Sequence, residues 1–259
     1  MPFFLLTQMV RREILGRYRG SFAGLAWSLF NPLLMLIVYT IVFGSVFQSR
    51  WPAAAHNSDS RLEFGLILFA GLIPFNLFAE TISRAPTLVT ANPNYVTKVI
   101  FPLYILPLVS FGAAAFHAVA SLFVLLAATW LIRGNVPATA LLIPVVWLPL
   151  ILLSLGLGWL FASLGVFFRD LNQGISILVT VLMFMSPLFY PSSALPQWLH
   201  DWLWINPLLA VIESTRAIVI WGEQPAWRLL AFSLLTNGAI AALGLIFFQR
   251  SRAAFPDVI

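Results

Sequence analysis

Long apolar runs alternate with short polar segments along the whole sequence. Most runs hold about 20 residues or more, the length that an α-helix needs to cross the hydrocarbon core of a bilayer. The pattern predicts an all-α polytopic membrane protein, with one transmembrane domain over 1–259 and a second span that Pro74 interrupts. The six predicted spans are 28–47, 65–82, 103–132, 141–168, 174–185 and 229–248.

The first 24 residues have a different pattern. Arg11, Arg12, Arg17 and Arg19 alternate there with apolar residues, as in amphipathic helices that lie in the membrane interface. Segment 1–24 is therefore expected to be an interface helix, acting either as a basic anchor or as a gating or partner-contact element. Because its arginines follow the apolar start, a cleavable secretory signal is not expected.

Segment 186–228 is too polar for two full spans and too apolar for a soluble loop. It holds five prolines and five of the ten tryptophans, and tryptophan favours the headgroup level of a membrane. We expect short paired helices that re-enter the membrane from the extracytoplasmic side. Glu213 and Arg216 are three positions apart, so they would share a helix face and could pair, either as a structural contact or as a gate.

Composition and charge strengthen the membrane interpretation. Hydrophobic residues make up 61% of the 259 positions and charged residues 9%, whereas a soluble domain carries about 25% charged residues. The net charge of +5 comes from basic residues between apolar runs, which favours lipid headgroups over nucleic acid as their partners. Six spans place nine basic residues on the side of the termini and five on the other. The positive-inside rule then predicts cytoplasmic termini.

The residues of common catalytic and metal sites are sparse. The sequence has no G-x-x-x-x-G-K-[ST] phosphate-binding motif and no cysteine, and its three histidines are scattered. His117, in the third predicted span, is interpreted as a satisfied packing residue, the alternative being a ligand. Glu80, near the end of a span, is the only acidic residue inside the predicted spans, which argues against ion-coupled transport. The energy for transport is therefore expected to come from another chain.

Three stretches form a characteristic set in this order along the chain. They are Arg17-Tyr18-Arg19-Gly20-Ser21 continuing to Gly24, Trp27-Ser28-Leu29 and Asn31-Pro32; the segment 92–102; and Phe168-Arg169-Asp170-Leu171, followed by 186–191, Pro196 and Asn206-Pro207. Together, over six spans of matching length, they resemble the membrane subunits of bacterial ABC-type polysaccharide exporters. That family handles lipopolysaccharide O-antigen, capsular polysaccharide and teichoic acid.

The resemblance implies a set of partners and a location. It implies a homodimer in the bacterial inner membrane, joined to two copies of a separate cytoplasmic ABC ATPase that would hold ATP and Mg²⁺. This chain would need no cofactor of its own, and its other partners would be membrane lipids and a polysaccharide substrate that is lipid-linked. The missing phosphate-binding motif agrees independently with a separate ATPase.

The segment 84–101 would be the cytoplasmic loop that couples the chain to its ATPase. The resemblance implies this role, and Arg84, Asn94, Tyr95 and Lys98 are its candidate contact residues. Its length, its bounding prolines and its predicted cytoplasmic side favour coupling. The alternative is an ordinary connecting loop.

Aromatic residues are candidates for the path of a glycan, because flat rings can contact sugar C–H surfaces without stripping every hydroxyl of water. Tyr39, Phe43 and Phe47 recur every four residues and so form one stripe on the first span. Met183, Phe184, Phe189 and Tyr190 extend the fifth span and the segment after it. The alternative is that these side chains face lipid or pack on neighbouring helices.

Two other functions remain open from the sequence. One is an ABC exporter subunit for a drug or a lipid, which would have a smooth aliphatic cavity. The other is a membrane-embedded glycosyl- or acyltransferase, which would need acidic residues or histidines clustered at a membrane face. No such cluster is evident in the sequence, so a transport subunit without enzymatic activity is the leading interpretation.

Overall fold

The computed structural model describes residues 2–42, 60–97, 101–191 and 206–258, and within these ranges the secondary structure is helical with no strand. The predicted all-α fold is confirmed. Five helical stretches of the described chain are long and apolar enough to cross a membrane, and a sixth apolar helix is shorter. The main helices are α1 (Pro2–Tyr18), α2 (Trp27–Ile41), α3 (Ser60–Arg84), α5 (Ile105–Arg133), α7 (Leu148–Phe167), α8 (Leu171–Met185) and α11 (Trp227–Ser251).

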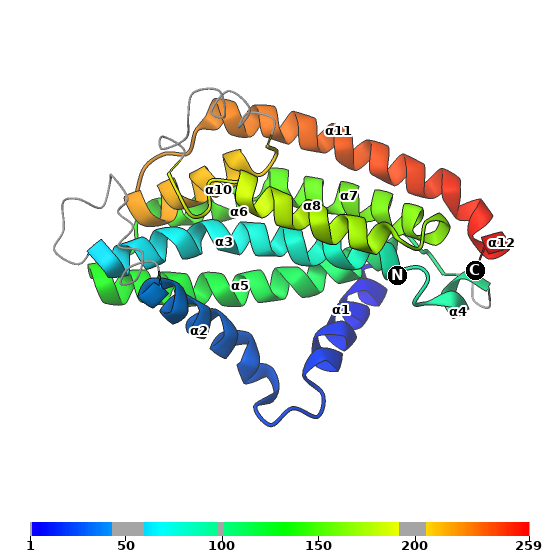
Figure 1. Ribbon diagram of the computed structural model, residues 1–259, viewed down its shortest axis with the longest axis horizontal. Coiled ribbons are helices and arrows are strands. Elements are labelled where there is room, and N and C mark those ends of the chain that lie inside the picture. Colours follow the sequence, from blue (N-terminus) through cyan, green and yellow to red (C-terminus); the bar gives the residue numbers. More distant parts are fainter. Residues whose placement is uncertain (1, 43–59, 98–100, 192–205, 259) are drawn as a thin grey trace.

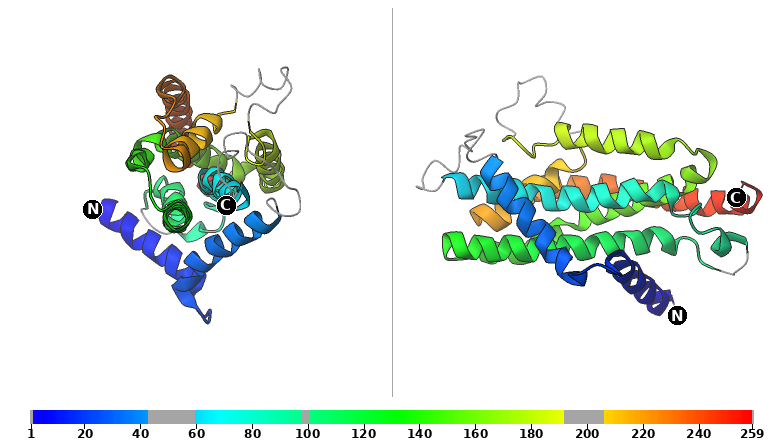
Figure 2. Two further views of the ribbon diagram at one scale, coloured as in Figure 1. Left: turned by 90° about the vertical axis from the view of Figure 1, so that its left-hand side faces the viewer. Right: turned by 60° about the horizontal axis from the view of Figure 1, so that its bottom comes forward.

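Most of these helices lie along one axis and form a bundle (Figure 1). Helices α3, α5, α7, α8 and α11 run side by side, and α11 packs along α7. The start of α1 and the end of the chain lie near the same end of the bundle in both side views (Figures 1 and 2). This agrees with an even number of membrane crossings.

Helix α3 is the central element of the bundle. It is apolar around most of its circumference, which is typical of a buried helix, and most of its side chains are buried inside the bundle. Pro74 lies inside α3 without ending it, so the expected interruption of the second span is wrong. Neighbouring helices surround Pro74, and such packing compensates for the one backbone hydrogen bond that proline cannot make.

Helices α1 and α2 form a V whose tip points away from the bundle (Figure 1). Helix α1 packs on α5, and α2 packs on α3 and α5. Between them the chain turns and passes through the 3₁₀ turn η1 (Gly24–Ala26). The predicted interface helix 1–24 is thus helical to Tyr18, and the described part of the first span ends at Val42.

Close backbone contact joins α7 to α11. A Cβ atom added at Gly244 of α11 would lie 2.1 Å from the carbonyl oxygen of Gly156 in α7, and one at Gly156 would lie 2.6 Å from the Cα of Ala241. Small residues let helix backbones approach in this way, and van der Waals contact then drives association in membranes.

The remaining elements are short and lie at the two ends of the bundle. At the end that holds the termini, the segment 84–101 contains a 3₁₀ turn and a small helix. A second 3₁₀ turn and small helix follow α11 at the end of the described chain. At the other end, short helices precede α7 and follow the segment 186–191. They are η4 (Ala85–Thr87), α4 (Pro93–Thr97), η5 (Ala138–Leu142), α6 (Ile143–Val146), α10 (Leu209–Arg216), the π-helical turn η8 (Ala217–Trp221), η9 (Arg252–Ala254) and α12 (Phe255–Val258).

The fifth predicted span is shorter than a bilayer. Helix α8 has 15 residues and therefore a length of about 22 Å, against a hydrocarbon core of about 30 Å. It begins at Leu171, three residues before the predicted start of the span at 174. After α8, the segment 186–228 contributes one described short helix, α10, while 192–205 lie outside the described residues.

The substitution Gly244→Ala should destabilise the protein, because its methyl group would separate α7 from α11. Overpacking of this kind costs about 1–3 kcal/mol, which should appear as a lower thermal midpoint in detergent. The matched control is Gly238→Ala on the same helix, where the nearest atom to an added Cβ is a side-chain carbon at 3.8 Å. Equal midpoints for the two variants would contradict the close contact.

Candidate functional site

A network of polar side chains fastens α1 to the bundle. Arg17 of α1 donates a hydrogen bond to Glu80 of α3, and the Tyr18 hydroxyl and Nε2 of His117 in α5 form a hydrogen bond of 2.9 Å. Nδ1 of His117 lies 3.0 Å from Oε2 of Glu80. Four side chains from three helices therefore contact one another in a half-buried position.

The network also changes the pKa of the tyrosine that takes part in it. Burial raises the pKa of the Tyr18 phenol; Arg17 opposes this shift, and Glu80 adds to it. The phenol is therefore protonated at neutral pH.

The candidate coupling segment begins beside this network. Arg84 at the end of α3 donates to Glu13 of α1 at 2.7 Å. Asn94 is exposed on α4, whereas Tyr95 is half-buried and stacks on Phe101 with ring centroids 4.5 Å apart. Lys98 lies outside the described residues. The structure thus separates an anchored Arg84 from an exposed Asn94, and no direct contact joins them among the described residues.

Glu213 and Arg216 form the expected pair on α10. Nη1 of Arg216 lies 3.1 Å from Oε1 of Glu213, and the Arg216 side chain is completely buried. The exposed part of Glu213 is about a quarter of its side chain. The count of basic residues on each side of the membrane assumed that Arg216 meets lipid headgroups. That assumption is wrong, because Arg216 is buried inside the bundle.

Arg216 also connects three parts of the chain through backbone carbonyls. Its Nε donates to Ile67 of α3 at 3.0 Å, and its terminal nitrogens donate to Pro187 at 2.6 Å and Leu188 at 2.8 Å. Gly71, one turn after Ile67, leaves room for the guanidinium, since an added Cβ would lie 2.6 Å from Nη2. The buried Arg216 side chain therefore supplies hydrogen bonds to carbonyl groups of the non-helical backbone that follows α8.

Side chains from other elements donate hydrogen bonds to backbone carbonyl groups of the π-helical turn after α10. Arg133 at the end of α5 donates to the carbonyl oxygen of Ile220 and lies 3.0 Å from Glu63 of α3. Thr139 donates to the carbonyl oxygen of Ile218 at 2.6 Å. The segment between the fifth and sixth spans is thus fixed to α3 and α5 by polar contacts.

The aromatic residues proposed for a path lie in two places. Tyr39 is half-buried and packs against the main hydrophobic core, and Phe43 and Phe47 lie outside the described residues. After α8, the rings of Phe184 and Phe189 are 6.3 Å apart, and the Tyr190 hydroxyl donates to the Phe184 carbonyl at 2.7 Å. Phe184 is largely exposed, whereas Met183 and Phe189 pack on the core. A glycan-path role for these residues stays a prediction.

Sequence reasoning did not find the network of Arg17, Tyr18, Glu80 and His117. His117 was expected to be a satisfied packing residue, and its hydrogen bonds agree with that, but its partners were not predicted. The available signal was that Glu80 and His117 are polar residues within apolar runs. Because Glu80 and His117 are 37 positions apart, the sequence pattern did not indicate that they are in contact. Within the described chain, no group of three or more His, Cys, Asp or Glu side chains could hold a metal ion.

Most of the chain is similar to one family of known proteins. Residues 5–220 match a family model described as ABC-2 type transporter. The chain is 30% identical to the O-antigen export system permease protein RfbA of Myxococcus xanthus, over 98% of this chain and 95% of that protein. It is 25% identical to RfbA of Klebsiella pneumoniae, over 99% and 95%. It is also 27% identical to the polysialic acid transport protein KpsM of Escherichia coli, over 82% and 79%.

The substitution Arg216→Met should lower the free energy of unfolding by at least about 3 kcal/mol, because it leaves three carbonyl groups and Glu213 without their buried donor. Thermal unfolding in detergent measures this loss. The matched control is Arg228→Met, which removes an exposed arginine at the start of α11. The interpretation fails if both variants unfold at the wild-type temperature.

Proposed function

Because the chain belongs to the ABC-2 type transporter family, we propose that it is the membrane-spanning permease subunit of an ATP-driven exporter that moves a polysaccharide out of the cytoplasm. The observation that carries this proposal is the similarity over nearly its whole length to permeases of O-antigen export. It is a transport subunit and not an enzyme. The sequence contains no phosphate-binding motif, so ATP is hydrolysed by a separate subunit.

A polysaccharide is preferred over a drug or a lipid as the cargo. The relatives named above are O-antigen and polysialic acid transport proteins. Exposed Phe184, with Phe189 and Tyr190 beside it, provides aromatic faces at the end of α8 that suit sugar rings. In the proposed assembly, two copies of this chain form the path for a lipid-linked glycan and bind two copies of the ATPase.

The termini and α4 lie on the cytoplasmic side in this proposal. Arginines at the ends of helices gather at the end of the bundle that holds the termini, in α1, at Arg84, at Arg169, and at Arg250 and Arg252. At the other end, Arg216 is buried, which leaves still fewer basic residues to face headgroups there. This distribution supports the orientation with cytoplasmic termini in the inner membrane.

The coupling role of segment 84–101 follows from that orientation. A segment that transmits movement from an ATPase must be firmly attached to the spans, because a loose loop would absorb the movement. Arg84 is held by Glu13, and Tyr95 stacks on Phe101. Asn94 and Thr97 remain exposed on α4, where a partner could reach them.

Reconstitution tests the export function directly. Liposomes that contain this chain and the ATPase expressed with it should move a lipid-linked polysaccharide across the bilayer only when ATP is supplied. The measurement is the amount of glycan that becomes accessible to a membrane-impermeant lectin. Liposomes with the chain alone, and liposomes with an ATPase that cannot hydrolyse ATP, are the controls. Movement of a drug or phospholipid in place of the glycan would contradict the proposal.

Single cysteines test the orientation, since the sequence has none of its own. Thr97→Cys on α4 should react with an impermeant maleimide only after the inner face of the membrane is opened. Glu223→Cys should react in intact spheroplasts, because Glu223 is exposed between η8 and α11 at the opposite end. The reverse labelling pattern would overturn the assigned orientation.

A further inference from the structure

Helix α12, which follows α11, folds against the coupling segment 84–101. It packs on α4 and α7, and α4 and α12 lie at the same end of the bundle (Figure 1). In α12, Phe255 is completely buried, whereas Pro256, Asp257 and Val258 are exposed. The Phe255 ring is therefore the part of α12 that enters the protein interior.

The ring of Phe255 joins the ends of α7 and α11. Its centroid lies 5.6 Å from that of Phe248 in α11, edge to face at an interplanar angle of 75°, and 6.1 Å from that of Phe167 at the end of α7. Aromatic pairs favour edge-to-face geometry over direct face-to-face stacking. These contacts are made by the same two helices whose backbones approach each other at Gly156 and Gly244.

The coupling segment contributes to the same buried cluster as Phe255. Val89 is completely buried in this cluster, and Tyr95 and Phe101 pack against it. The cluster is distinct from the main core that surrounds α3. Because closely packed side chains are hardly compressible, a displacement of one member is passed on to its neighbours.

The backbone on both sides of the cluster is fixed to α7. At the start of the coupling segment, a Cβ atom added at Gly165 of α7 would overlap the carbonyl oxygen of Pro86. Just after the segment, Nε1 of Trp159 in α7 donates to the carbonyl oxygen of Tyr104 at 3.0 Å. The coupling segment is thus attached to α7 at its start and beyond its end, and Phe255 packs in the cluster between these two contacts.

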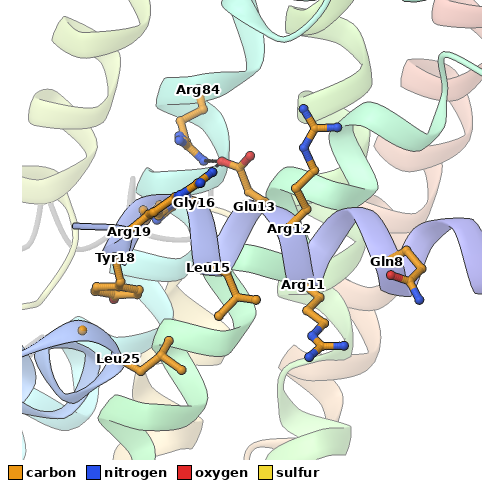
Figure 3. A pocket seen from close by; sticks show the side chains of 12 residues that line it. Gln8, Arg11, Arg12, Glu13, Leu15, Gly16, Tyr18, Arg19, Leu25 and Arg84 are labelled. Carbon is orange, nitrogen blue, oxygen red and sulfur yellow. Dashed lines mark hydrogen bonds and ion pairs between the residues drawn. The ribbon is translucent and has the colours of Figure 1, made fainter. Parts of the chain in front are cut away.

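The attachment of the coupling segment to α1 is of a different kind. Figure 3 shows Arg84 and Glu13 pointing toward each other, and their side chains are 39% and 35% exposed. Water screens an ion pair that is exposed to this degree, so it contributes little, whereas removal of a buried ring leaves a costly cavity. The coupling segment is therefore attached more firmly to α7 and α11 than to α1.

We propose that Phe255 is a positioning residue for coupling, which holds the coupling segment against α7 and α11 so that a displacement of α4 moves these two helices together. Removal of its ring would leave a cavity beside Phe167 and Phe248, and α4 could then move without α7 and α11. The coupling part of this inference rests on the proposed export function, whereas the position of the segment does not.

Hydrogen exchange, measured by mass spectrometry on the full chain in detergent, tests the position of the segment. Phe255→Ala should raise the exchange rate of the backbone amides in 88–97 by about tenfold, because a cavity beneath a short helix favours local opening. Phe255→Leu keeps most of the apolar volume and should restore slow exchange. The matched control is Val258→Ala, which shortens an exposed side chain of the same helix and should leave exchange unchanged.

Two exchange results would overturn the proposal. One is an unchanged rate in 88–97 for Phe255→Ala, which would show that the ring does not hold the segment. The other is an equal rise of the rate in α3, which would indicate a loss of stability throughout the bundle in place of a local release.

The amount of glycan moved for each ATP hydrolysed tests the coupling role, in liposomes that contain the chain and the ATPase expressed with it. For Phe255→Ala this ratio should fall about tenfold. The KM for ATP should keep its wild-type value, because the separate subunit binds the nucleotide. Phe255→Leu should recover most of the ratio, and Val258→Ala should keep all of it.

A wild-type ratio of glycan to ATP in Phe255→Ala would contradict the coupling role. A fall of transport and ATP hydrolysis in equal proportion would contradict it as well, since it would indicate a defect of folding or assembly. If the wild-type chain moves no glycan, the export function itself is wrong, and hydrogen exchange still decides whether Phe255 positions the segment.

Discussion

Every backbone carbonyl in a membrane bundle needs a donor from within the protein, and that need decides the structure between the fifth and sixth spans. Helix α8 ends before it could cross a bilayer, and the chain continues as Ser186 to Tyr190 without regular helix. Arg216 supplies the missing donors to Pro187 and Leu188 and holds both against Ile67 of α3. These features depend on one another: the end of the short α8 leaves carbonyl groups unpaired, the buried Arg216 donates to them, and Gly71 leaves room for its guanidinium.

The opposite end of the bundle uses charge in a different way. There, Glu13, Arg17, Glu80 and Arg84 pair in the half-buried zone between α1 and the spans, and Tyr18 and His117 complete the contacts. Helix α2 packs on α3 and α5. Directional hydrogen bonds thus help to hold α1 on the bundle.

Apolar runs were sufficient to predict most helices, because the length of a span follows from the thickness of the bilayer. The limits of α5 and α11 lie within three residues of the predicted ones. The pattern failed where partners distant in sequence decide the outcome. Pro74 did not interrupt its helix because α3 is surrounded by other helices. The Arg17 and His117 contact spans 100 positions, and the Gly156 and Gly244 approach joins residues from two spans, so neither has a local sequence signal.

The length of α8 also has a consequence for the lipid around it. An apolar helix of about 22 Å beside a hydrocarbon core of about 30 Å creates a hydrophobic mismatch, which a bilayer relieves by thinning next to the protein. Ile177 and Val181 are exposed along α8, so any lipid that touches this helix is compressed. Such compression costs a fraction of a kcal/mol for each ångström of mismatch. The face that carries α8 is therefore the place where membrane thickness acts on this protein.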